Sequence, residues 1–181
     1  MKILFLSDTH SQHRKLKDLP EADLIIHGGD VSKMGTDHEV EDFMRWFSGL
    51  DYGYKIFIAG NHDFFFEGET PKSIKRFLNE NTFYLHNSSV EIEGLKIMIT
   101  HIGGYPNRYE RGIKELIEIE RPNIFISGHS HILKVISDPK YSLLHINPGA
   151  AGRQGIHQIS TLIRFTIDSV PKDLEILEFN K

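Results

Sequence analysis

Residues 54–63 read YKIFIAGNHD, an apolar run that ends in a glycine, an amide, an imidazole and a carboxylate. Two earlier segments follow the same order: KILFLS (2–7) runs into Asp-Thr-His, and ADLIIHGGD (22–30) ends in Gly-Asp. Short apolar runs bounded by turn residues are typical of buried strands. Because a polar cluster is a poor end for a hydrophobic element, each of these ends serves either a turn or a chemical function.

Helical patterns accompany these strands. The segment 36–50 has an N-cap residue, Thr36, with Glu39 three residues later, and apolar side chains at helical spacing: Val40, Phe43, Met44 and Phe47. A second helix is expected over residues 70–80, with Thr70 as its cap and Pro71 in its first turn. The alternation of strand and helix favours a parallel sheet with crossover connections.

The second half of the chain has a different pattern. Residues 88–100 alternate in polarity and break at Glu93-Gly94, as a hairpin does. An amphipathic helix is expected over residues 109–120. Further strands are expected at 123–127, 132–137, 141–146, 159–167 and 174–179. With no repeat and no linker, we expect a single domain over residues 1–181, built from a pair of mixed sheets with helices outside.

The composition narrows the class of protein. The chain has 181 residues, 39% of them hydrophobic, and a formal net charge of −4, which disfavours a strong electrostatic hold on nucleic acid. It has no cysteine, which excludes disulfides, thiolate metal ligands and a cysteine nucleophile. No segment has the apolar length that a bilayer requires, and the apolar run 3–6 is too short for a signal-peptide core. We therefore expect a cytoplasmic protein without a membrane partner.

Five apolar runs end in polar clusters. Ligand crevices of open α/β sheets lie beyond the carboxyl ends of the strands, so clusters far apart in sequence would meet there. Taken singly, each cluster is also explained by a turn or a cap. Taken together, carboxylates, one amide and imidazoles without a thiolate favour a site for two divalent cations that share a carboxylate. The clusters contain Asp8 and His10; Asp30; Asn61, His62 and Asp63; His101; and His129 and His131.

This series resembles the motifs of the calcineurin-like metallophosphoesterases, namely D-x-H, G-D, G-N-H-[DE], an isolated histidine after a strand, and G-H-x-H. The matching residues span positions 6–131 in the same order. The short chain and the INPGA segment (146–150) look like the small one-domain prokaryotic phosphodiesterase branch. The resemblance implies a four-layer α-β-β-α sandwich, an α/β (α+β) fold in which helices flank two mixed β-sheets.

The resemblance also implies roles for individual residues. One cation would be held by Asp8, His10, Asp30 and His131, and the other by Asp30, Asn61, His101 and His129, with Asp30 bridging. The two cations would lower the pKa of a bridging water so that hydroxide attacks phosphorus. His62 would be the general acid for the leaving group. Asp63 would orient the His62 imidazole and raise its pKa.

The resemblance leaves the substrate and the metals open. Mn²⁺ is the expected cofactor, with Fe, Zn²⁺, Ni²⁺ or Mg²⁺ as alternatives. The expected activity is hydrolysis of small phosphodiesters. The alternatives are a phosphomonoesterase, a nuclease, and a non-catalytic scaffold that works through protein contacts, as a retromer coat subunit of this family does. A homo-oligomer stays open, and nucleic acid beyond nucleotides is not an expected partner.

Several histidines and arginines outside these motifs are expected to have structural rather than catalytic roles. His27 and His145 lie within apolar strands and are expected to be hydrogen-bonded core residues. His13 is expected at a solvated helix start. Arg108 and Arg111 are expected at ordinary surface positions, with phosphate binding as the alternative.

Overall fold

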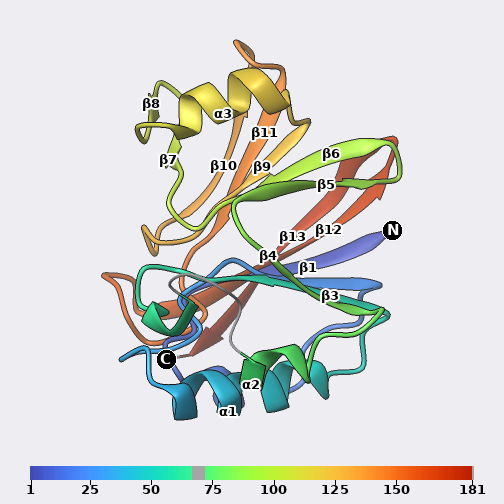
Figure 1. Ribbon diagram of the computed structural model, residues 1–181. Coiled ribbons are helices and arrows are strands. Elements are labelled where there is room, and N and C mark those ends of the chain that lie inside the picture. Colours follow the sequence, from blue (N-terminus) through green and yellow to red (C-terminus); the bar gives the residue numbers. More distant parts are fainter. Residues whose placement is uncertain (67–71, 181) are drawn as a thin grey trace.

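The computed structural model describes residues 1–66 and 72–180. Two mixed β-sheets lie face to face, with helices α1 (Asp37–Ser48) and α2 (Lys72–Lys75) outside one sheet and α3 (Ile113–Glu120) outside the other (Figure 1). This arrangement confirms the predicted four-layer α-β-β-α sandwich.

The first sheet has the order β13-β12-β1-β2-β3-β4. Its parallel part holds β1 to β4, so that the polar ends of β1, β2 and β3 point the same way. The long C-terminal hairpin of β12 and β13 adds to β1 in antiparallel fashion. The strands are β1 (Lys2–Leu6), β2 (Leu24–His27), β3 (Tyr54–Ile58), β4 (Thr82–Leu85), β12 (Ile159–Asp168) and β13 (Val170–Asn180).

The second sheet has the order β10-β11-β9-β6-β5. Its central strands β6, β9 and β11 are parallel, and the two edge strands are antiparallel to their neighbours. The predicted hairpin turns at Glu93-Gly94, where both residues have positive φ. The strands are β5 (Ser88–Ile92), β6 (Leu95–Ile99), β9 (Ile124–Ile126), β10 (Leu133–Asp138) and β11 (Leu143–Pro148), with a separate ribbon of β7 (Gly104–Tyr105) and β8 (Arg108–Tyr109).

The layers are held together by apolar side chains. Between the sheets lies a cluster of mostly β-branched residues that includes Ile26, Ile58, Ile126 and Phe165. A second cluster joins the first sheet to α1, and a third joins the second sheet to α3. Helix α1 starts as predicted: Thr36 and Glu39 form both hydrogen bonds of a capping box.

The structure corrects two sequence predictions and contains elements that were not predicted. The helix expected over 70–80 is only the single turn of α2, and the predicted cap at Thr70 and Pro71 lies outside the described residues. Helix α3 starts at Ile113 rather than at 109, because Tyr109 belongs to β8 and Gly112 has φ 83°. Strand β4 was not predicted, and neither was the ribbon of β7 and β8.

Two histidines lie in the interior as predicted. His27 Nε2 lies 3.0 Å from Thr9 Oγ1, and His145 Nε2 lies 3.0 Å from Ser127 Oγ. Burial lowers the pKa of both rings, in His145 to about 4. Both rings are therefore neutral in the folded protein at neutral pH.

Acid should destabilise the fold partly through His145. Its folded pKa is about 4 and its unfolded pKa is about 6.5, so its contribution is present above pH 6.5 and is lost as the pH falls toward 4. At pH 5 the loss from this group is about 2 kcal/mol. Urea unfolding of the chelator-treated protein should show a smaller fall in unfolding free energy between pH 7 and pH 5 for His145→Gln than for the wild type. The exposed-site variant His38→Gln is the matched control and should behave as the wild type. An unchanged pH dependence in His145→Gln would refute this assignment.

Candidate metal centre

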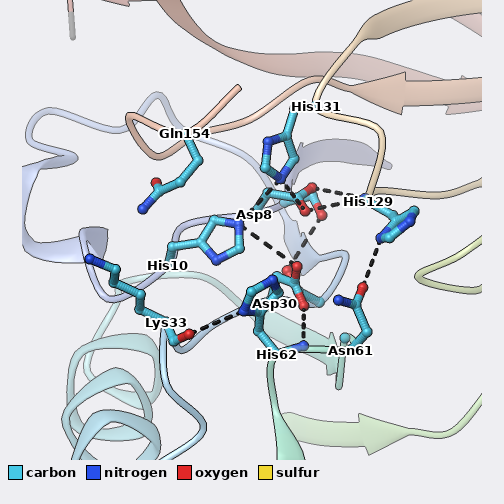
Figure 2. Close-up of polar contacts among 12 residues, drawn as sticks. Asp8, His10, Asp30, Lys33, Asn61, His62, His129, His131 and Gln154 are labelled. Atoms are coloured by element: carbon cyan, nitrogen blue, oxygen red, sulfur yellow. Dashed lines mark hydrogen bonds and ion pairs between the residues drawn. The ribbon is translucent and has the colours of Figure 1, made fainter. Parts of the chain in front are cut away.

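The predicted ligands come from the carboxyl ends of both sheets and meet in one place (Figure 2). Asp8 and His10 follow β1, Asp30 follows β2, and Asn61 follows β3. The second sheet supplies His101 after β6, and His129 and His131 after β9. Strands from two sheets thus converge on a single cluster.

Four of these side chains form one group. Ligand atoms of Asp8, His10, Asp30 and His131 all lie within 4.8 Å of one another. His131 Nε2 is 3.2 Å from Asp8 Oδ1 and 3.2 Å from His10 Nε2. The Nε2 atom of His10 is 3.7 Å from Asp30 Oδ2. Two imidazole nitrogens and two carboxylates therefore face a common point.

A second group shares Asp30 with the first. Ligand atoms of Asp30, His101 and His129 lie within 4.8 Å of one another. His101 Nε2 is 3.3 Å from Asp30 Oδ2, and the Asn61 side-chain oxygen Oδ1 lies 3.1 Å from His101 Nε2 and 2.7 Å from His129 Nδ1. Asp30 is the only residue common to both groups.

The backbone around the site is strained. Asp8, His10, Asp30, His129 and His131 all have φ between 43° and 65°. Residues other than glycine rarely adopt positive φ. Those that do are often found at functional sites, where the surrounding structure holds them in this conformation. These backbone conformations turn the chain sharply after each strand, so that the side chains converge at the strand ends.

Two glycines allow the loops to pack this closely. A Cβ atom at Gly29, which has φ +96°, would lie 2.5 Å from His101 Nδ1. A Cβ atom at Gly60 would collide with the carboxylate of Asp30. The glycines before Asp30 and Asn61 are therefore required by close approach as well as by the turns themselves.

Charge in the site is balanced through His101. Burial disfavours its charged form, but the hydrogen bond with Asp30 and the charges of Asp8 and Asp30 raise the pKa of His101 to about 9. Burial works against ionisation of Asp30 too, but hydrogen bonding and charge from His101 lower the pKa of Asp30 to about 2. His101 Nδ1 donates to the carbonyl oxygen of Gly28 at 2.7 Å, which directs Nε2 toward Asp30.

These features fit divalent cations. Carboxylate oxygens, an amide oxygen and imidazole nitrogens suit Mn²⁺, Fe, Zn²⁺ or Mg²⁺, and the oriented Nε2 of His101 is typical of a ligating histidine. A cation between the His10 and His131 nitrogens would take both as ligands in place of the hydrogen bond that joins them. Binding requires a neutral His101, so it releases that ring's proton.

His62 lies at the open side of this cluster. Its backbone amide donates to Asp30 Oδ1 at 2.9 Å, and its ring Nδ1 donates to the Lys33 carbonyl oxygen at 3.1 Å (Figure 2). The ring packs edge-on against His10 with centroids 5.0 Å apart. The Nδ1 hydrogen bond leaves Nε2 available to a ligand.

The predicted pairing of Asp63 with the His62 ring is wrong. The Asp63 carboxylate is buried and accepts hydrogen bonds from Gly60 N at 2.8 Å, Val31 N at 3.1 Å and Ser32 Oγ at 2.6 Å. Burial raises the pKa of Asp63, while these hydrogen bonds oppose the rise. Asp63 therefore connects the loop after β3 to the loop after β2. The His62 ring is hydrogen-bonded by the Lys33 carbonyl oxygen and not, as predicted, by Asp63.

Other residues near the site differ from expectation. His13 is fully buried rather than solvated, with Nε2 3.2 Å from Asp42 Oδ2. Asn147 was not predicted as a site residue, and its side-chain amide nitrogen donates to Gly128 O at 2.6 Å and to Ser130 Oγ at 3.2 Å. It therefore holds the loop that carries His129 and His131, and its only sequence signal was its place in the INPGA segment.

A groove of about 450 Å³ opens beside the second group of ligands. Its lining includes Asn61 and His101 together with Arg111 and Ile102. Arg108 is not among the lining residues. Of the two arginines that the sequence singled out, Arg111 is therefore the one placed next to the cluster.

The paired sheets and the shared ligands at their strand ends define a metallophosphoesterase. Residues 1–170 match the calcineurin-like phosphoesterase superfamily domain, and the chain belongs to that superfamily. This confirms the resemblance drawn from the motifs.

Individual relatives agree with the family. Metallophosphoesterase domain-containing protein 1 of Homo sapiens is 32% identical over 117 residues, which make up 53% of this chain and 36% of the human protein. The match thus spans little more than a third of that relative. A novel archaeal phosphodiesterase has a similar structure, with a TM-score of 0.72 and 23% identity over 99% of this chain and 100% of that chain. Vps29 from Entamoeba histolytica complexed with Zn²⁺ gives a TM-score of 0.58 and 14% identity over 99% and 100% of the two chains. At these identities the two structures show a shared fold.

Among residues 1–66 and 72–180, no helix has the length and apolar character to span a bilayer.

The role of Asp63 is testable with Asp63→Asn. An amide cannot accept from all the donors around this carboxylate, so at least one buried N–H loses its partner, at a cost of about 1–3 kcal/mol. Urea unfolding without metal should show this loss, with weaker metal binding because the loop that carries Asn61 is released. Asp51→Asn, at an exposed carboxylate, is the control and should change neither quantity. Full stability with a shifted pH profile of activity would restore the predicted orienting role.

Proposed function

We propose that this protein is a dinuclear-metal phosphoesterase that hydrolyses small phosphodiesters. The first cation would be held by Asp8, His10, Asp30 and His131, and the second by Asp30, Asn61, His101 and His129. The observation that carries the proposal is that Asp30 belongs to both ligand groups. Seven ligands, one of them a carboxylate shared by both groups, suit two ions better than one.

The cations, when bound, would polarise phosphoryl oxygens and make a water nucleophilic near neutral pH. The protein would supply the remaining chemistry. His62 faces the open side of the cluster, and its Nδ1 is held by the Lys33 carbonyl, so Nε2 can deliver a proton to the leaving oxygen. Because Asp30 accepts from the His62 amide, the carboxylate that would hold both cations also positions the proposed acid.

Several observations support a diester of modest size. The groove beside Asn61 and His101 has about 450 Å³, within the range of small-molecule sites, and Arg111 and Ile102 in its wall could contact one ester arm. The similarity to an archaeal phosphodiesterase supports the reaction class. We further propose Mn²⁺ as the metal, a single domain and a cytoplasmic location. A scaffold role, as an alternative, would need neither His62 nor its hydrogen bond.

The reaction class is tested by removing metal with chelator and restoring one divalent cation at a time. Hydrolysis of bis(p-nitrophenyl) phosphate should recover, and should exceed hydrolysis of p-nitrophenyl phosphate. A preference for the monoester would make the protein a phosphomonoesterase. Two bound cations without turnover of either compound would contradict the proposed activity and favour the scaffold.

Replacing His62 tests the general acid. His62→Ala should keep its metal content and lose about 100-fold or more in kcat on a diester with an alkoxide leaving group. The loss should be smaller on bis(p-nitrophenyl) phosphate, because p-nitrophenolate needs little protonation. His38→Ala, at an exposed histidine in the first turn of α1, is the matched control. Equal losses on both substrates would exclude proton delivery by His62.

Replacing Asp30 tests the bridge. Asp30→Ala should lose both cations, whereas His131→Ala removes a ligand of the first group only and should keep the second cation. Elemental analysis after dialysis against Mn²⁺ measures the stoichiometry of each variant. Two cations per chain in Asp30→Ala would show that this carboxylate does not bridge.

A further inference from the structure

A hollow of about 380 Å³ lies between the loop after β1 and the C-terminal hairpin. Three cationic side chains line it: Lys15, Lys17 and Arg153. No carboxylate is among its lining residues. The half-buried ring of Phe179 and the hydroxyl of Ser160 form part of its wall, from paired positions on β13 and β12.

Within the described part of the chain, these cations have no carboxylate partner. None of the three forms an ion pair with a carboxylate of the described residues, whereas Arg14, Arg164 and other exposed cations of the chain do. The chain as a whole has a net charge of −4, so a local group of three cations is not explained by a basic composition. Like charges that share one concavity repel each other unless an anion joins them, and the field they create raises the local anion concentration.

A chain of hydrogen bonds leads from the hollow to Gln154. Lys15 Nζ donates to Gln12 Oε1 at 3.3 Å, and Gln12 Nε2 donates to Gln154 Oε1 at 2.9 Å. The loop that carries Gln154 packs against a predicted ligand, because a Cβ atom at the adjacent Gly155 would lie 2.9 Å from His131 Cβ. Arg153, whose side chain lines the hollow, directly precedes Gln154, so their Cα atoms are about 3.8 Å apart.

The loop that carries both residues is also fixed to the metal-binding backbone. Ala151 N donates to Ser7 O at 2.9 Å, and Gly152 N donates to Asp8 O at 3.0 Å. On its other side Ser160 Oγ donates to Gly152 O at 3.1 Å. An occupant of the hollow therefore contacts a segment that is hydrogen-bonded directly to a predicted ligand loop.

We propose that this hollow is a second binding site, for a phosphate group of an organic phosphate. Arg153 offers a planar guanidinium fork, which suits bidentate contact with phosphate oxygens, and Lys15 and Lys17 offer point charges. The Phe179 ring provides an apolar surface for the organic part. The phosphate belongs either to a distal part of the substrate or to a separate effector, and both share this recognition chemistry.

Binding is measured on the full chain freed of metal, so that the metal centre does not contribute. Isothermal titration with AMP and with inorganic diphosphate should give saturable binding that weakens as salt rises. Lys17→Met/Arg153→Met should weaken AMP binding at least tenfold. Arg108→Met/Lys140→Met changes the net charge equally away from the hollow and should leave the affinity unchanged.

The metal-loaded protein then distinguishes the two sources of phosphate. If the hollow binds a distal phosphate of the substrate, Lys17→Met/Arg153→Met raises the KM for the 5′-phosphorylated dinucleotide pApA. The KM for ApA, which lacks that phosphate, stays unchanged. If the hollow binds an effector, AMP alters ApA hydrolysis in the wild type and not in the variant. Equal AMP affinity of the wild type and the Lys17→Met/Arg153→Met variant, or no binding by the wild type, would overturn the proposal. The binding experiment needs no turnover, so its result is independent of the proposed phosphoesterase activity.

Discussion

The buried carboxylate of Asp30 is the group on which the rest of the site depends. It is 1% exposed, belongs to both ligand groups, pairs with His101 and accepts from the amide of His62. A charge in such a place is tolerated only with close partners. The fold supplies them from both sheets, and Gly60 leaves the space that the carboxylate occupies.

The two-sheet architecture explains why this cluster forms only in the folded chain. Asp8 and Asp30 come from the first sheet, while His101, His129 and His131 come from the second, more than 70 residues further along the chain. The apolar cluster between the sheets fixes how their carboxyl ends face each other. Because the ligand set does not exist in the unfolded chain, cations that bind it stabilise the native state by mass action.

Sequence patterns predicted the sheets and the polar clusters at the strand ends because both depend on local signals. Apolar runs mark the strands, and each ligand stands at the end of a run. Contacts between loops left no such signal: Asp63 reaches the backbone of Val31 rather than the adjacent His62, and His13 is buried by Asp42 and α1 instead of lying in solvent. Helix α3 starts four residues later than its apolar periodicity predicts, because β7 pairs with β8 and Gly112 has a positive φ.

The central claim is that one carboxylate joins two cations. The most direct measurement is a crystal structure of the Mn²⁺-loaded protein, with an anomalous difference map recorded at the manganese edge. We expect two peaks, one on each side of the Asp30 carboxylate, the first among His10, His131 and Asp8 and the second among His101, His129 and Asn61. A single peak, or a second peak that Asp30 does not contact, would contradict the account.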